Sequence, residues 1–113
     1  MKKLLVISAV LAGLAVPAGA HAAPKPCKRI VNPYAGTRYE GSDLYRIRAR
    51  KVSCRTARRV VRRGHRKALA DTPDRYGIVR VTYRRWTIAG DLTGDHDHYF
   101  ATAPGGKRVT WLF

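Results

Sequence analysis

The sequence predicts an α+β fold, in which one main amphipathic helix packs on a small antiparallel sheet of about four or five strands and one disulfide staples the domain. Three observations predict it. Residues 54–70 place apolar side chains at helical spacing. Segments on both sides of them alternate with the two-residue period of strands, and the 113-residue chain holds two cysteines.

The beginning of the chain has the three regions of a secretory signal peptide. Lys2 and Lys3 form a basic start, residues 4–16 are an apolar run, and Pro17 leads to the small-residue sites of residues 18–22. A run of 13 residues is shorter than the about 20 that a transmembrane helix needs. We expect cleavage after Ala22, a single mature domain of residues 23–113 without an integral membrane segment, and secretion to the extracellular space.

The two cysteines are expected to form the disulfide. In an exported chain, Cys27 and Cys54 most simply pair with each other, although free or metal-bound thiols are the alternative. The loop that they close would contribute about 3 kcal/mol in the chain-entropy model. The bridge would pin residues 27–31 against the start of the helix.

The first strands flank a loop. We predict a short strand at Arg29–Val31, a turn-rich loop at Asn32–Ser42, and a strand from Leu44. In that second strand the inner positions belong to one alternating set and the outer positions to arginines. The inner set is Tyr45, Ile47 and Ala49, and the outer set is Arg46, Arg48 and Arg50.

The helix is expected to begin after Ser53, whose hydroxyl can cap the exposed amides. Its end stays open, because Gly64 suits a left-handed cap while Ala68 and Leu69 preserve the apolar spacing as far as Ala70. The apolar arc consists of Cys54, Ala57, Val60, Val61 and Ala68.

The last third of the chain predicts further strands. Apolar alternation from Val79 changes parity near Arg84-Arg85, which a bulge would explain. Residues 99–113 read as a hairpin with its loop at residues 104–106. The aromatic residues Tyr45, Tyr83, Trp86 and Trp111 could form a platform for bases or sugars. In a domain this small, the two tryptophans are better explained as core.

Charge is the strongest functional signal. The chain has 23 basic and 7 acidic residues, a net charge of +16, and loss of Lys2 and Lys3 with the signal peptide would leave +14. Such a charge favours polyanionic partners, although arginines that merely solvate the surface are the alternative. The predicted polyanion-binding residues are Arg46, Arg48, Arg50, Arg55, Arg58, Arg59, Arg62, Arg63 and Arg66.

The helix carries a pattern that resembles a known group of proteins. Residues 52–61 read V-x-C-x-x-A-R-x-V-V, a later strand carries Trp86, and residues 106–113 close the chain. Together they resemble small secreted bacterial proteins of unassigned function. The resemblance implies export and a small α+β fold, and it transfers no functional residue. Many such proteins carry a second cysteine pair, but Thr87 follows the tryptophan here and no later cysteine exists.

A second, local resemblance concerns residues 93–100. Their D-H-Y sequence is similar to the ending of secreted microbial ribonucleases, which implies His98 as general acid and Arg84 with Arg85 as neutralisers of the phosphorane charge. The general base of that mechanism is a glutamate. No glutamate lies between the helix and His98, and Glu40 precedes the helix.

The same segment offers weak metal candidates, namely Asp95, His96, Asp97 and His98. A calcium loop would need glycine and glutamate where His96 and Thr102 stand. Two histidines on an extended segment could share zinc or copper with a carboxylate, although a polar loop is the commoner explanation. We therefore expect no cofactor and no metal.

The sequence as a whole favours a secreted, non-enzymatic and monomeric domain that binds polyanions, such as nucleic acid, anionic wall polymer or a membrane surface. Two alternatives stay open. One is a weak ribonuclease that uses His98. The other is an inhibitor or interaction module for another secreted protein, for which residues 32–42 or 104–107 could supply an exposed loop.

Overall fold

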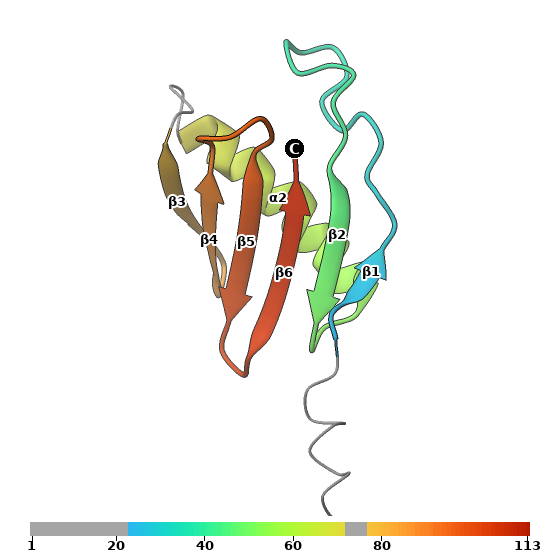
Figure 1. The fold of residues 1–113 in the computed structure, drawn as a ribbon, viewed down its shortest axis with the longest axis vertical. Coiled ribbons are helices and arrows are strands. Elements are labelled where there is room, and N and C mark those ends of the chain that lie inside the picture. The colour runs from blue at the N-terminus through green and yellow to red at the C-terminus, as the bar shows by residue number, and fades with distance from the viewer. Residues whose placement is uncertain (1–22, 72–76) are drawn as a thin grey trace, which may run out of the picture.

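The computed structural model describes residues 23–71 and 77–113, and the predicted signal peptide lies outside them. One helix, α2 (Cys54–Asp71), packs on one face of a six-stranded antiparallel sheet and runs obliquely behind it in Figure 1. The strand order is β1-β2-β6-β5-β4-β3. The α+β prediction is confirmed, with six strands instead of four or five. The strands are β1 (Lys25–Cys27), β2 (Tyr45–Arg50), β3 (Ile78–Tyr83), β4 (Trp86–Asp91), β5 (His98–Ala103) and β6 (Lys107–Leu112).

The additional strand comes from the segment in which a bulge was predicted. Residues 78–91 form two strands, and Arg84-Arg85 is the two-residue turn between them, with Tyr83 opposite Trp86. Arg84 has a φ of 53°, in the left-handed region that such tight turns use. The bulge prediction is therefore wrong. The change of parity marks a reversal of the chain.

The N-terminal strand also lies elsewhere than predicted. β1 covers Lys25–Cys27 and pairs with β2, whereas Ile30 makes only an isolated bridge to Leu44. Pro26 fits this edge position because it has no amide to donate to a further strand. The predicted disulfide is confirmed: Cys27 is bonded to Cys54, with 5.4 Å between their Cα atoms. It fastens the edge strand to the start of α2.

Helix α2 begins as predicted and runs to Asp71, which agrees to within one residue with the later of the two predicted ends, Ala70. The Ser53 hydroxyl accepts a hydrogen bond of 3.1 Å from the Thr56 amide. Gly64 does not end the helix. A Cβ placed on it would lie 2.3 Å from Cδ1 of Ile88, so the glycine allows α2 to approach β4 closely. No helix in the described parts of the chain is long and apolar enough to cross a bilayer.

The core lies between α2 and the inner face of the sheet. Trp111 is 1% exposed and its ring stacks on that of Tyr99, with 5.4 Å between the centroids. Trp86 is also buried, so the explanation of both tryptophans as core holds. Tyr45 was predicted to face inward, but it is only half-buried and lies outside the core.

The position of Tyr45 follows from an irregularity in β2. The pairing of β2 with β6 shifts register between Tyr45 and Arg48, and Arg46 has a φ of 50°. The extra residue changes the parity of the strand, so that Leu44 and Ile47 are the buried positions. Tyr45 therefore turns away from the core.

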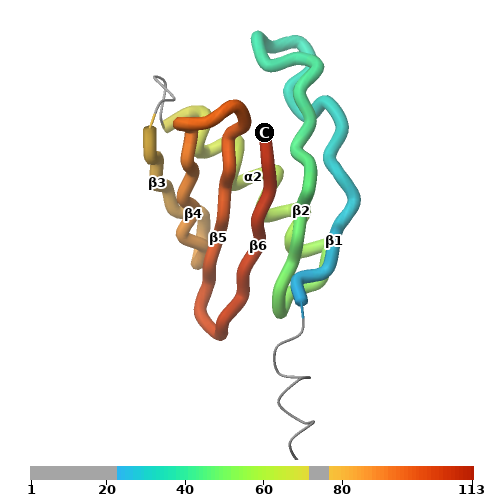
Figure 2. Tube along the Cα trace, viewed as in Figure 1, coloured from blue at the N-terminus to red at the C-terminus, as the bar shows by residue number. Residues whose placement is uncertain are grey.

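A buried histidine connects the helix to the long loop between β1 and β2. His65 is 0% exposed and its Nδ1 hydrogen-bonds the hydroxyl of Tyr34, whose loop rises beyond the end of the sheet in Figure 2. The rings of Tyr99 and Phe113 also contact His65, with centroid distances of 4.8 and 4.3 Å. This cluster holds the base of the loop against the core.

Candidate polyanion interface

The predicted arginines lie on two opposite faces of the molecule. Because α2 covers one face of the sheet, its outer side chains point away from the sheet's uncovered face (Figure 1). We call that uncovered side the open face. Arg48 and Arg50 of β2 lie on it, whereas the helix arginines lie on the opposite side. The nine predicted residues therefore do not form one continuous surface.

The first cationic surface, here named the helix face, consists of Arg55, Arg59, Arg62, Arg63 and Arg66, all of them exposed. None of these five forms an ion pair with a carboxylate within residues 23–71 and 77–113, where the ion pairs are Arg29–Asp43 and Lys67–Asp71. Like charges three and four residues apart repel each other on a helix. A bound anion would relieve that repulsion.

Arg58 differs from the other helix arginines. Its Nε donates a hydrogen bond of 3.1 Å to the carbonyl of Lys28, and its Nη2 donates one of 3.3 Å to the carbonyl of Arg29. These bonds fasten the segment after β1 to α2, one and two residues beyond Cys27 of the disulfide. Arg58 therefore stabilises the fold, and its guanidinium has fewer donors left for a ligand.

A hollow of about 310 Å³ opens between the helix face and the β3–β4 turn. Three arginines line it: Arg59, Arg63 and Arg84. Tyr83 is also a lining residue, and its hydroxyl is buried with no hydrogen-bond partner among the described residues. Guanidinium groups are donors that suit phosphate and sulfate oxygens. The remaining lining residues are Thr56, Val60 and Trp86.

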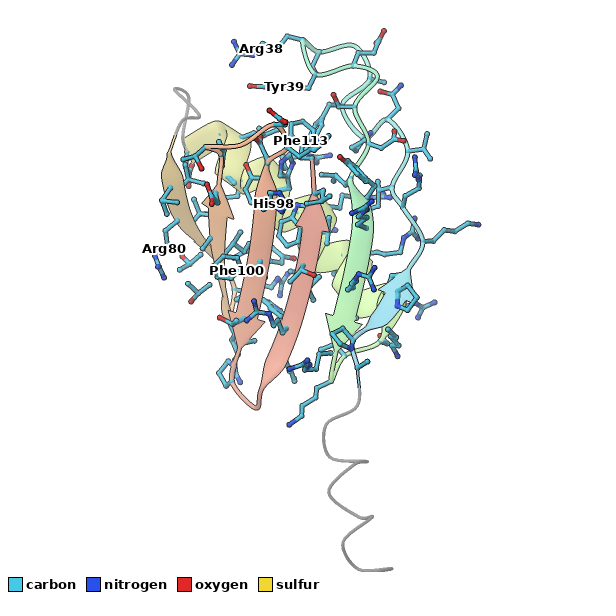
Figure 3. The ribbon with its side chains drawn as sticks, in the orientation of Figure 1. Arg38, Tyr39, Arg80, His98, Phe100 and Phe113 are labelled. Atoms are coloured by element: carbon cyan, nitrogen blue, oxygen red, sulfur yellow. A yellow bond between two sulfur atoms is a disulfide. The ribbon has the colours of Figure 1, made fainter. Side chains whose placement is uncertain are left out.

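The open face carries the second cationic surface. Strand register aligns one row of side chains across it: Arg48, Thr110, Phe100, Ala89 and Arg80. Figure 3 labels Phe100 near the middle of the sheet and Arg80 on β3. Arg50 and Arg108 begin the neighbouring row, which continues through Thr102 and Thr87 to Thr82. Charge and an exposed aromatic ring thus occur together here.

The residues of the ribonuclease alternative are not brought together. His98 pairs with Asp91 at one end of β4, whereas Arg84 and Arg85 precede the other end. The five steps from Trp86 to Asp91 along the extended strand separate these ends by about 17 Å. Glu40 accepts a hydrogen bond from the Gly36 amide in the long loop and lies on no strand.

The candidate metal ligands also make other interactions in the structure. The Nδ1 of His96 lies 2.9 Å from the hydroxyl of Tyr45, with which it hydrogen-bonds. The main chain of Asp97 pairs with that of Phe113 through bonds of 3.1 and 3.0 Å. No three His, Cys, Asp or Glu side chains within the described ranges are grouped so that they could hold a metal ion.

Asp91 is the acidic group of the open face. Its carboxylate accepts hydrogen bonds from the hydroxyl and the amide of Thr93, at 2.6 and 3.1 Å. These bonds lower the pKa of Asp91 below its ordinary value, and the charge of His98 contributes in the same direction. Asp91 is therefore a stable negative charge beside an otherwise cationic surface.

Sequence reasoning missed Phe100, Arg80 and Arg108 as possible contact residues. A signal exists in the alternation of residues 98–103, where Tyr99 and Ala101 face the core and leave Phe100 on the opposite side. The hollow had no such signal, because it joins a helix to a distant turn.

Comparisons with protein-family models, with curated proteins and with solved structures found no match to this chain.

Proposed function

We propose that this protein is a secreted, non-enzymatic domain that binds polyanions through its helix face. The observation that carries the proposal is the hollow beside that face, which Arg59, Arg63 and Arg84 line and whose described lining contains no carboxylate. The polyanion could be nucleic acid, anionic wall polymer or an acidic membrane surface, since each presents repeated oxyanions.

The energetics favour a ligand that carries many charges. A polyanion that neutralises several arginines releases its condensed counterions, and this release supplies much of the binding free energy. The hollow adds a local contribution, because a phosphate or sulfate group in it could meet guanidinium donors from both the helix and the β3–β4 turn. Diffuse charge and a defined subsite would then act together.

Secretion is supported by the disulfide between Cys27 and Cys54. Such bonds form and persist in oxidising compartments. After cleavage the extracellular domain would carry a net charge of +14, and its available partners would include extracellular anionic polymers.

The test is a binding screen of residues 23–113 against RNA, DNA, heparin and anionic liposomes over a range of salt concentrations. Two triple variants remove equal charge: Arg59→Gln, Arg63→Gln, Arg84→Gln at the hollow, and Arg55→Gln, Arg62→Gln, Arg66→Gln outside it. We expect the hollow variant to lose more affinity, by about tenfold, because its three arginines line one hollow and could donate to the same oxyanion. Absence of salt-sensitive binding by the unmodified protein would overturn the proposal.

RNA integrity in the same samples tests the ribonuclease alternative. The proposal expects His98→Ala to leave RNA binding nearly unchanged, because binding is electrostatic. RNA cleavage that this substitution abolishes would favour the alternative instead.

A further inference from the structure

Phe100 is an aromatic side chain exposed on the middle strands of the sheet. It is 39% exposed on the open face, and its cross-strand neighbours in the same row are the short side chains Thr110 and Ala89. Phe100 is therefore the one large apolar side chain in this part of the row, and part of its ring is open to solvent. The core does not need this ring, since it lies on the side of the sheet opposite α2.

Arginines surround this ring in a regular frame. Arg48 on β2 and Arg80 on β3 lie in the row of Phe100, each two strands away, a separation of about 10 Å. The guanidinium carbon of Arg108 lies 5.3 Å from the centroid of the Phe100 ring, which is cation–π distance. The open face therefore combines a π surface with positive charge on both sides of it.

A carboxylate at one end of the open face makes its charge uneven. Asp91 lies on the open face one row from Phe100, and its pairing partners on either side are His98 and Ile78. Row spacing along a strand is about 7 Å. A chain of phosphates would be repelled at the Asp91 end and attracted at the end where Arg50 and Arg108 pair. The favoured path thus crosses the rows of Phe100 and Arg108.

We infer that the open face binds single-stranded nucleic acid, with a base stacked on Phe100 and phosphates near Arg48, Arg80 and Arg108. Base faces stack on aromatic rings and guanidinium planes with little regard to sequence, and they are available only where the strand is unpaired. Heparin and duplex DNA match the charge but offer no free base face. The inference goes beyond the proposed function, because it assigns a second surface and one ligand class.

The test compares four probes of matched charge: an oligothymidylate and an oligouridylate of about 12 nucleotides, heparin, and duplex DNA. We expect Phe100→Ala to weaken binding of both single strands by about 5- to 150-fold, the range of one lost stacking contact, and to leave heparin within about twofold. Phe100→Leu, which keeps apolar bulk, should lose nearly as much. Phe100→Trp should retain binding, and circular dichroism checks that each variant is folded.

The controls separate this inference from the proposed function. Changing Arg48, Arg80 and Arg108 to glutamine should weaken the single strands more than heparin, whereas the hollow variant should weaken all four probes. Equal losses for Phe100→Ala on heparin and on oligothymidylate, or no loss on either, would overturn the open-face inference while polyanion binding stood. If no probe bound in a salt-sensitive way, the proposed function would fail as well.

Discussion

The helix face and the open face are both rich in arginine, but they differ in what accompanies the charge. The helix face repeats arginines within residues 55–66 and exposes no aromatic ring among them. On the open face, arginines from three strands frame Phe100. Charge alone attracts any polyanion, whereas charge beside a ring can distinguish an unpaired base. Composition therefore predicts affinity for polyanions in general, whereas the order of the strands determines whether a surface can prefer unpaired bases.

The largest expected effect is on stability and comes from the disulfide, which fastens the start of the helix face to the edge strand of the sheet. Reduction of Cys27–Cys54 should lower the free energy of unfolding by about 3 kcal/mol, because the unfolded chain regains the freedom of the closed loop. Denaturant unfolding with and without reductant measures it. Two titratable thiols in natively purified protein would contradict the bond itself.

The second effect compares the charges of the two faces directly. Changing Arg55, Arg59, Arg62 and Arg66 to glutamine should flatten the dependence of log affinity for heparin on log salt by up to about four contacts. Between about 50 and 200 mM salt, the unmodified protein would then lose about 10²-fold more affinity than the variant. The matched variant changes Arg48, Arg50, Arg80 and Arg108. An equal change of slope in both variants would mean that heparin does not distinguish the faces.

The third effect concerns the packing of α2 on the sheet. Gly64→Ala should lower the free energy of unfolding by about 1 kcal/mol, because the cost of overlap with Cδ1 of Ile88 exceeds the helix propensity that alanine gains. Ile88→Val removes that atom. In the double variant the penalty should largely disappear, and a double-mutant cycle from denaturant unfolding measures the coupling. Additive effects would show that the two residues do not touch.

A smaller effect separates two arginines of the same helix. Arg58→Gln should lower the free energy of unfolding by about 0.5 kcal/mol or somewhat more, since its bonds to the carbonyls of Lys28 and Arg29 are lost. Arg55→Gln should change it little, because Arg55 is exposed and removing it relieves repulsion. Thermal unfolding of the two variants makes the comparison. A larger loss for Arg55 would reverse the roles that we assign.

The smallest effect is a pH dependence on the open face. The pKa of Asp91 is lowered in the folded state, so the stabilisation from its bonds to Thr93 is present above its ordinary value of 3.8. That contribution is lost as the pH falls through the lower, folded value. Asp91→Asn should therefore narrow the stability difference between neutral and acidic pH. Unchanged pH profiles of unfolding would show that the bonds form equally in the unfolded chain.

Sequence periodicity predicted the helix face because all of its residues belong to one helix. The cap at Ser53, the Cys27–Cys54 bond and the 104–106 turn also followed from local chemistry and cysteine count. The open face could not be read in this way, because the order of the strands decides which residues become neighbours. Tyr45 illustrates the limit: one irregular residue in β2 moved it from the predicted core to the outside.

The outer edge of β3 has a consequence for how molecules of this protein behave together. No described strand pairs with that edge, and Ile78 at its beginning is 69% exposed. Such an edge is a template for another chain, and charged side chains such as Arg80 are what discourage the pairing. A polyanion that neutralised Arg80 would remove this protection at the same time as it gathered many copies along its length. Filaments or precipitates would then form at intermediate ratios of polymer to protein, and they would dissolve again when polymer is in excess and spreads the copies apart.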